Sequence, residues 1–111
     1  MTLIWHHNTW PWGKTARVIT SHASGIVEMT FEDNSPGVCY ISGLSVIPPK
    51  RRRGIATRLM LACENYCREN GIFRLDLNSV MEDWVMEFYK KLGYVPIKEV
   101  DGFMQMYKLL K

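Results

Sequence analysis

The chain has 111 residues, of which 47% are hydrophobic and 23% charged, and its net charge at pH 7 is +3. This balance is typical of a folded globular domain and excludes a disordered tail. The length fits a single domain over residues 1–111. No stretch approaches the ~20 apolar residues of a membrane helix, and Met1–Gly13 lacks the apolar run of a signal peptide, so we expect a cytoplasmic protein without membrane partners.

The three cysteines, Cys39, Cys63 and Cys67, are odd in number and show no paired spacing. Cys63 and Cys67 stand four residues apart within a helical pattern, which favours core packing. We therefore expect a reducing compartment, with neither a disulfide framework nor a metal site. The adjacent His6 and His7 have no further ligands beside them in the sequence and are weak evidence for a metal.

The first third of the chain predicts β-structure. Ala16–Thr20 and Gly25–Asp33 are rich in β-branched and apolar residues and are separated by a Ser-Gly turn. Val38–Ile47 reads as a long apolar strand interrupted by Gly43, and a glycine within a strand predicts a bulge or a close backbone approach. Upstream, residues 1–12 are expected to hold one short strand and a loop rich in Trp and His.

An amphipathic helix is predicted to begin after Gly54, because apolar residues recur there with the 3.6-residue period of a helix. Asn70-Gly71 supplies its end, and the alternating segment Phe73–Leu77 predicts the next strand. The apolar positions of the helix are Ile55, Leu59, Cys63, Tyr66 and Cys67.

Ser79–Glu82 has the form of a capping box and predicts a second helix, which Gly93 ends. Val95–Val100 and Phe103–Leu109 then flank Asp101-Gly102, a favoured hairpin turn. The predicted order is β-β-β-α-β-α-β-β, an α/β class with a mixed, mostly antiparallel central sheet. The strand–helix–strand unit from Tyr40 to Leu77 should be a right-handed parallel crossover.

Four of the 14 basic residues are consecutive at Lys50–Arg53, between the long strand and the first helix. The first N–H groups of a helix have no partner within it and carry a partial positive charge, so they favour a phosphate. Gly54 and Ala56 keep bulky side chains away from such a ligand. The segment therefore indicates a phosphate site, with a solvated basic turn and a nucleic-acid contact as alternatives.

The same segment resembles the acetyl-CoA-binding signature of the GCN5-related N-acetyltransferase (GNAT) superfamily, which reads Arg or Gln, two residues, Gly, one residue, then Gly or Ala. Here the residues are Arg51-Arg52-Arg53-Gly54-Ile55-Ala56, preceded by a strand ending in Val46-Ile47-Pro48. The later Phe88–Tyr94 resembles the family's "FYxKLGF" segment. The resemblance covers about Val38 to Ile97.

This resemblance implies a GNAT-like fold with acetyl-CoA as cosubstrate. The backbone of Leu44, Ser45 and Val46 would bind the pantetheine arm as a neighbouring strand does. Lys50 and Arg52 are candidates for the adenosine 3′-phosphate, and Asn78 for a further pantetheine contact. The pyrophosphate would lie on the turn formed by Arg51, Arg52, Arg53, Gly54, Ile55, Ala56 and Thr57.

The resemblance also assigns a catalytic role to Tyr89, whose phenol would face the thioester sulfur, contribute to cofactor binding, and stabilise or protonate the departing thiolate. On an amphipathic helix beside Phe88, the same residue could instead be a plain core aromatic. Two positions depart from the family pattern. Glu82 stands where the family often has Asn, and Val85 where it often has Ala, which puts the detail of the acyl pocket in doubt.

The N-terminal region is shortened, because relatives commonly place two helices after their first strand and these help to wall the acceptor site. The acceptor side is therefore expected to be open to a small-molecule, peptide or protein amine, or to be closed by a second copy in a homodimer. No general base can be read from the sequence; Glu28, Glu32 and His22 are possible.

Three functions remain open from these residues. The first is an N-acetyltransferase that moves an acetyl group directly to an amine, because no cysteine stands out as a nucleophile. The second is a catalytically weak acyl-CoA-binding sensor or partner module. The third, a nucleic-acid binder using Lys50–Arg53, is not expected, because its positive charge is confined to one turn.

Overall fold

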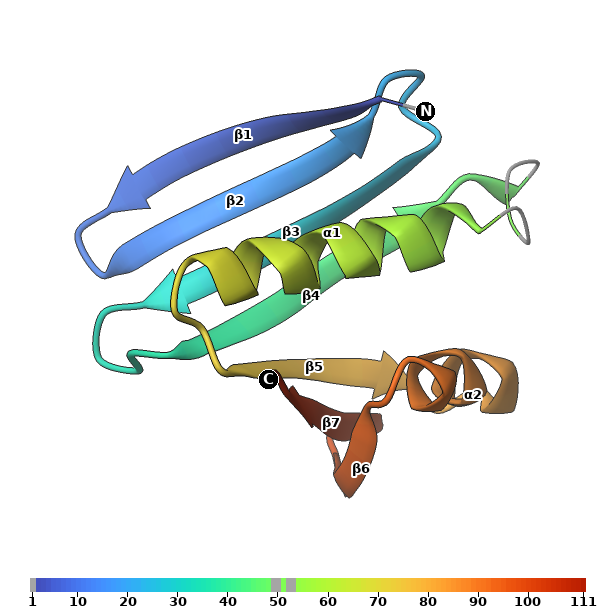
Figure 1. The fold of residues 1–111 in the computed structure, drawn as a ribbon. Coiled ribbons are helices and arrows are strands. Elements are labelled where there is room, and N and C mark those ends of the chain that lie inside the picture. Colours follow the sequence, from blue (N-terminus) through green and yellow to red (C-terminus); the bar gives the residue numbers. More distant parts are fainter. Residues whose placement is uncertain (1, 49–50, 52–53) are drawn as a thin grey trace.

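The computed structural model describes residues 2–48, 51 and 54–111. They form a seven-stranded sheet in the order β1-β2-β3-β4-β5-β7-β6 with two helices (Figure 1). Only β4 and β5 pair in parallel; every other neighbouring pair is antiparallel. The elements are β1 Leu3–Trp10, β2 Gly13–Thr20, β3 Gly25–Glu32, β4 Val38–Val46, α1 Ile55–Glu69, β5 Arg74–Val80, α2 Asp83–Lys91, β6 Val95–Val100 and β7 Phe103–Leu109.

The predicted α/β class and mostly antiparallel sheet are confirmed, and the expected hairpin around Asp101-Gly102 has the predicted bounds. Asp101 adopts the left-handed region at φ 52° and Gly102 follows at φ 82°, which is the backbone a tight hairpin turn demands. The N-terminal strand is longer than predicted, because β1 pairs with β2 over its whole length from Leu3 to Trp10.

The predicted capping box at Ser79–Glu82 is wrong. Ser79 lies inside β5, where its side chain is buried and its hydroxyl donates to the carbonyl of Val80 at 2.9 Å. The N-cap residue is instead Glu82, which has extended backbone and no side-chain capping bond, and the helix begins at Asp83. Pairing with β7 continues to Val80 and Phe103, so the sheet extends into the segment that resembles a cap in the sequence.

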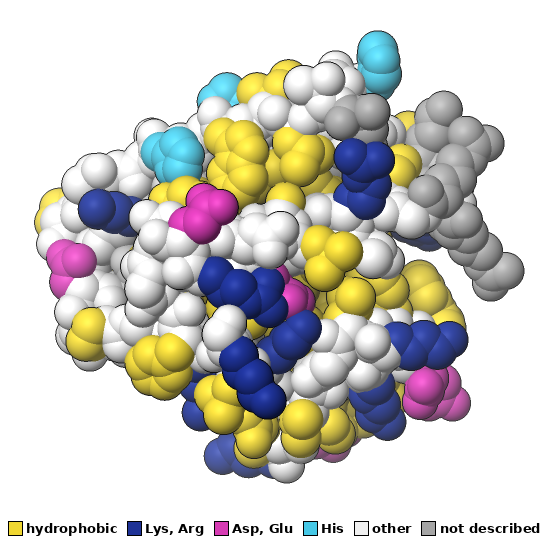
Figure 2. All heavy atoms as spheres, in the orientation of Figure 1, with side chains coloured by type: hydrophobic (Ala, Val, Ile, Leu, Met, Phe, Trp, Pro, Cys, Tyr) yellow, Lys and Arg dark blue, Asp and Glu magenta, His cyan; other side chains and the backbone are white. Residues whose placement is uncertain are grey.

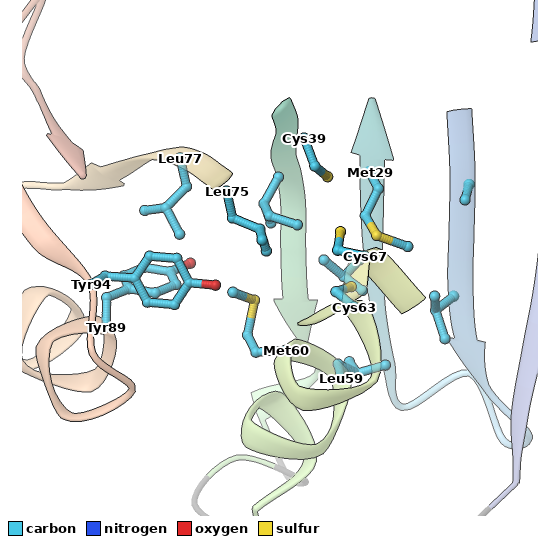
Figure 3. Close-up of a cluster of buried hydrophobic side chains, with 14 of the residues drawn as sticks. Met29, Cys39, Leu59, Met60, Cys63, Cys67, Leu75, Leu77, Tyr89 and Tyr94 are labelled. Atoms are coloured by element: carbon cyan, nitrogen blue, oxygen red, sulfur yellow. The ribbon is translucent and has the colours of Figure 1, made fainter. Parts of the chain in front are cut away.

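Alternation along the strands gives the sheet one buried face and one uncovered face. Residues such as Val18, Met29 and Leu75 are fully buried and form one cluster with apolar residues of α1 and α2. We call this side the helix face. Within the described residues no helix covers the opposite side, the open face, where Arg17 and Glu28 form an ion pair. Figure 3 shows the helix-face core between α1 and the strands.

The described residues contain no helix that is long and apolar enough to cross a membrane. The core itself carries one charged group, because Glu64 of α1 is fully buried. Its carboxylate accepts hydrogen bonds from the Tyr94 hydroxyl at 3.1 Å and from the Lys108 ammonium at 2.7 Å. A buried carboxylate needs such partners, and here they come from the loop after α2 and from β7.

Candidate active site

A cleft opens where the parallel pairing of β4 and β5 stops. The ladder runs from Val38 opposite Arg74 to Ile41 opposite Leu77, yet both strands continue, to Val46 and Val80. Figure 1 shows them diverging toward the ends of α1 and α2. The cleft between them has a volume of about 1020 Å³. In Figure 2 it corresponds to the hollow with hydrophobic (yellow) side chains on the right of the molecule.

Beyond Ile41, the edge of β4 that faces the cleft has no strand partner in the β4–β5 ladder. Unpaired strand N–H and C=O groups need partners, and an extended amide-containing ligand can supply them as an added strand does. Leu44, Ser45 and Val46, the residues predicted to contact the pantetheine arm, line the cleft along this edge.

The expected bulge in β4 is confirmed at Gly43, which has φ 66° and whose surroundings are open. The register with β3 shifts there, between Ile26 and Glu28. An extra residue in one strand reverses the alternation of side chains after it. Consequently Leu44 and Val46, as well as Ile41 before the bulge, belong to the buried side of the sheet.

One end of the cleft meets the first turn of α1. Gly54 is the N-cap residue with φ 76°, no side chain caps the turn, and no acidic residue lies in it. Among the described residues, a Cβ at Gly54 would meet nothing within 4 Å, so these residues leave the approach to the turn open. Ile55, Ala56 and Thr57 also line the cleft. These first N–H groups are the donors that a phosphate requires.

Arg51 lines the same end of the cleft, and its Nε donates to the carbonyl oxygen of Val46 at 3.0 Å. This bond ties the turn back to the end of β4, while the two terminal nitrogens of the guanidinium keep their donors for a ligand. Of the other predicted phosphate contacts, Lys50, Arg52 and Arg53 lie outside the described residues.

Tyr89 lies on α2 and lines the cleft, with 8% of its surface exposed. Its ring contacts Phe88 and Tyr94 edge to face, with centroids 5.1 and 5.9 Å away. Figure 3 shows Tyr89 and Tyr94 side by side, pointing toward Met60 of α1. Burial raises the pKa of Tyr89 to about 12, so near neutral pH the phenol keeps its proton and can donate it.

Asn78 lies on the open face, one residue beyond the last paired position of β5. Its Nδ2 donates to the Tyr40 hydroxyl of β4 at 3.3 Å, and both residues line the cleft. Tyr40 was not among the predicted site residues. The alternation of side chains along β4 could have indicated its position, because Tyr40 and Ser42 lie between the apolar residues of the buried side and so face away from the core.

The remaining wall comes from the start of α2 and its neighbours. Val85 and Phe88 line the cleft, and Glu82 accepts a 2.7 Å hydrogen bond from the indole of Trp84, which also lines it. Position 82 thus carries a carboxylate where the family pattern often has Asn, so the cleft is lined there by a group that accepts hydrogen bonds without an amide N–H. Glu82 and Val85 were noted in the sequence as departures near the acyl pocket. The lining residues that were not predicted are Tyr40, Ile41, Ser42, Gly43, Leu77, Ser79, Val80, Trp84, Phe88 and Phe103.

The structure brings none of the three sequence candidates for a general base to the cleft. Glu28 is held by Arg17 at 3.4 Å on the open face, and neither it nor Glu32 nor His22 lines the cleft. Among the described residues, Glu82 is the one carboxylate that does.

The cysteines are free thiols and all three are buried away from the cleft. Burial is the main cause that raises the pKa of Cys63 to about 12, and a hydrogen bond with Cys67 together with burial raises that of Cys39. Thiols that are protonated and inaccessible are poor nucleophiles. This arrangement offers no support for an acyl-cysteine intermediate.

The model of the acetyltransferase (GNAT) family matches residues 5–94. The chain belongs to this family. The match extends from Trp5 in β1 to Tyr94, just before β6, and so includes both sides of the cleft. No match is found among curated proteins.

Solved structures of the family share this fold. PaiA N-acetyltransferase from Thermoplasma acidophilum, solved with coenzyme A, superposes with a TM-score of 0.74 at 18% identity over 86% of this chain. A GNAT acetyltransferase of Staphylococcus aureus Mu50 gives 0.74 at 20% over 89%, and a putative N-acetyltransferase of Lactobacillus plantarum gives 0.72 at 17% over 89%. The chain spans 59%, 69% and 70% of their respective lengths.

Proposed function

We propose that the protein transfers an acetyl group from acetyl-CoA directly to an amine. The observation that carries the proposal is the cleft itself, which joins three features in one space. These are the unpaired edge of β4, the uncapped first turn of α1, and the buried phenol of Tyr89. The arrangement suits a long ligand with a phosphate group at one end and a reactive thioester at the other.

In this proposal the pyrophosphate of acetyl-CoA binds to the N–H groups of Ile55, Ala56 and Thr57, with the guanidinium of Arg51 beside it. The pantetheine arm then runs along Leu44–Val46, where its amides replace the missing strand. The coenzyme A held by the Thermoplasma acidophilum relative supports this choice of ligand.

The reaction then needs a donor for the leaving sulfur. A neutral amine attacks the thioester carbon, a C–N bond forms, and the C–S bond breaks to release a thiolate. Tyr89 stabilises this sulfur by donating a hydrogen bond or its proton, since its raised pKa keeps the phenol protonated. The proton lost by the amine passes to solvent.

Calorimetric titration with CoA tests the binding step. We expect saturable binding by the parent and at least about tenfold weaker binding by Arg51→Glu, which reverses a charge at the phosphate end. Arg58→Glu is the matched control, because Arg58 is exposed on α1 and does not line the cleft. A folded parent that does not bind CoA, or equal losses in both variants, would contradict the proposal.

A second candidate, an acyl-CoA-binding module without efficient turnover, is favoured by one observation. The described residues provide no helix between β1 and β2, so the open face lacks an acceptor wall of that kind. Release of free CoA thiol in the presence of small amines and peptides distinguishes the two. Thiol release that depends on the amine supports the enzyme, and CoA binding without any turnover supports the module.

A further inference from the structure

The two edges of the sheet differ in how they are protected against pairing with another strand. The edge strand β6 contains Pro96, Lys98 and Glu99, and its register with β7 shifts between Pro96 and Lys98. Prolines, charges and bulges are the features by which natural proteins block an exposed sheet edge. The edge at β6 therefore carries the usual protection.

The edge strand β1 carries none of these features. Its eight residues, Leu3–Trp10, include no proline and no Asp, Glu, Lys or Arg, and they pair with β2 in unbroken register. Six of the eight are exposed. An uncharged, regular strand of this length presents a row of unpaired N–H and C=O groups that is ready to bind another strand.

The direction of these free groups follows from the pairing with β2. The amide of Ser21 donates to the carbonyl of Thr2 at 2.8 Å, which makes that position a hydrogen-bonded pair. Such pairs alternate along an antiparallel ladder, so the even-numbered residues of β1 bond to β2. The backbone groups of Leu3, Trp5, His7 and Thr9 consequently point to the free edge.

We propose that β1 pairs antiparallel with β1 of a second copy of this chain, about a two-fold axis beside His6. In this register Leu3 faces Thr9 of the partner copy and Trp5 faces His7, which yields about eight backbone hydrogen bonds from four hydrogen-bonded pairs. The pairing is isologous, so each copy uses the same surface. An uncharged strand meets its own copy without repulsion between like charges, and this favours self-association over a charged partner.

The side chains along β1 suit this partner. Trp5 and His7 stack on the helix face with centroids 6.1 Å apart and both contact Tyr66, so the interface would extend an existing aromatic cluster. On the open face, Ile4 is 43% and Trp10 46% exposed. Pairing across the axis would cover part of both surfaces.

A charge placed on the axis tests the register. In His6→Glu the two new carboxylates would face each other across the axis. Within one copy the Glu would lie beside Arg17 of β2, whose opposite charge should leave folding intact. Asn8→Glu is the matched control, because it adds the same charge on the same face but lies opposite Ile4. We expect dimerisation to weaken about fivefold or more in His6→Glu and by clearly less in Asn8→Glu.

Sedimentation and light scattering across protein concentrations measure the association. Amide hydrogen exchange locates it, because dimerisation should slow exchange at Trp5, His7 and Thr9 while the even-numbered amides of β1 stay as slow as before. A parent that remains monomeric up to about millimolar concentration overturns the proposal. So does a dimer that His6→Glu leaves unchanged, or protection that appears at β6 instead.

Discussion

Lys108 of β7 donates a 2.7 Å hydrogen bond to the carboxylate of Glu64, whose side chain is 1% exposed. The same ammonium donates to the carbonyl oxygen of Leu92 at 2.7 Å. The Tyr94 hydroxyl also donates a hydrogen bond to the Glu64 carboxylate, and the Tyr94 ring contacts Tyr89. The charge pair thus joins α1, β7 and the C-cap residue of α2.

Replacing Lys108 with Met should lower the free energy of unfolding by about 3 kcal/mol, because it leaves a buried carboxylate without its closest cation. Chemical denaturation measures the loss. Lys90→Met is the control, since Lys90 and Glu87 form an exposed pair at 3.8 Å; its effect should stay within about 0.5 kcal/mol. Equal losses in the two variants would show that the buried pair adds nothing specific.

Tyr89→Phe should reduce kcat by about 100-fold or more while CoA affinity changes less than about twofold. The phenyl ring keeps the packing against Phe88 and Tyr94 and removes only the donor for the leaving sulfur. Steady-state kinetics with calorimetry separates the two quantities. Undiminished turnover in this variant would assign Tyr89 to the core alone.

The raised pKa of Tyr89 also predicts a loss of stability in alkali. The folded protein retains this proton up to a pKa of about 12, whereas the unfolded chain loses it near 10. The folded state therefore holds more protons between these values, and stability that is complete below pH 10 falls as the pH rises. Tyr89→Phe should decline less over this window, by on the order of 2 kcal/mol. Parallel declines of the two proteins would contradict the assigned burial.

In Gly54→Ala, the loss in the free energy of CoA binding should exceed the loss in the free energy of unfolding. The φ of 76° disfavours a Cβ by roughly 1–2 kcal/mol, although the space around it is open. A methyl group there also lies where a phosphate would approach the first turn of α1. Gly71→Ala is a suitable control, because Gly71 has φ 74° and open surroundings at the opposite end of the helix. CoA affinity lost equally in both would argue against a phosphate at Gly54.

The three thiols should resist alkylation at pH 8 in the folded protein and react together after denaturation. Each is buried, and the pKa of Cys63 is raised to about 12, so almost no accessible thiolate exists. Mass spectrometry after a short iodoacetamide pulse counts the modified residues. Rapid modification of one thiol in the native protein would reveal a reactive site that the structure does not contain.

Local sequence signals predicted most of the fold. The 3.6-residue period located α1, and Asp101-Gly102 located the final hairpin. The signals failed where tertiary pairing decides the outcome. β1 contains polar residues at His6 and Asn8 and owes its extended form to β2, and Ser79 belongs to a strand because β7 pairs with it.

The site was predictable where backbone chemistry defines it. Gly54 and the first turn of α1 follow from a strand, a basic turn and a helix in succession. The alternation of β4 places Tyr40 away from the buried side, but its contact with Asn78 could not be predicted, because the two residues are 38 positions apart in the chain. Glu82 was recognised only as a departure from the family pattern, whereas in the structure it lines the cleft.

The strand order from β1 to β4 follows the order of the chain, so each strand pairs with its immediate predecessor through a short connection. Such local pairing closes small loops and favours rapid formation of this half of the sheet. The parallel pairing of β4 with β5 is different, because the whole of α1 lies between these strands in the chain. Their pairing therefore closes a larger loop and should form later. We therefore expect the two walls of the cleft to come together late in folding, so that substitutions around it alter unfolding rates more than folding rates.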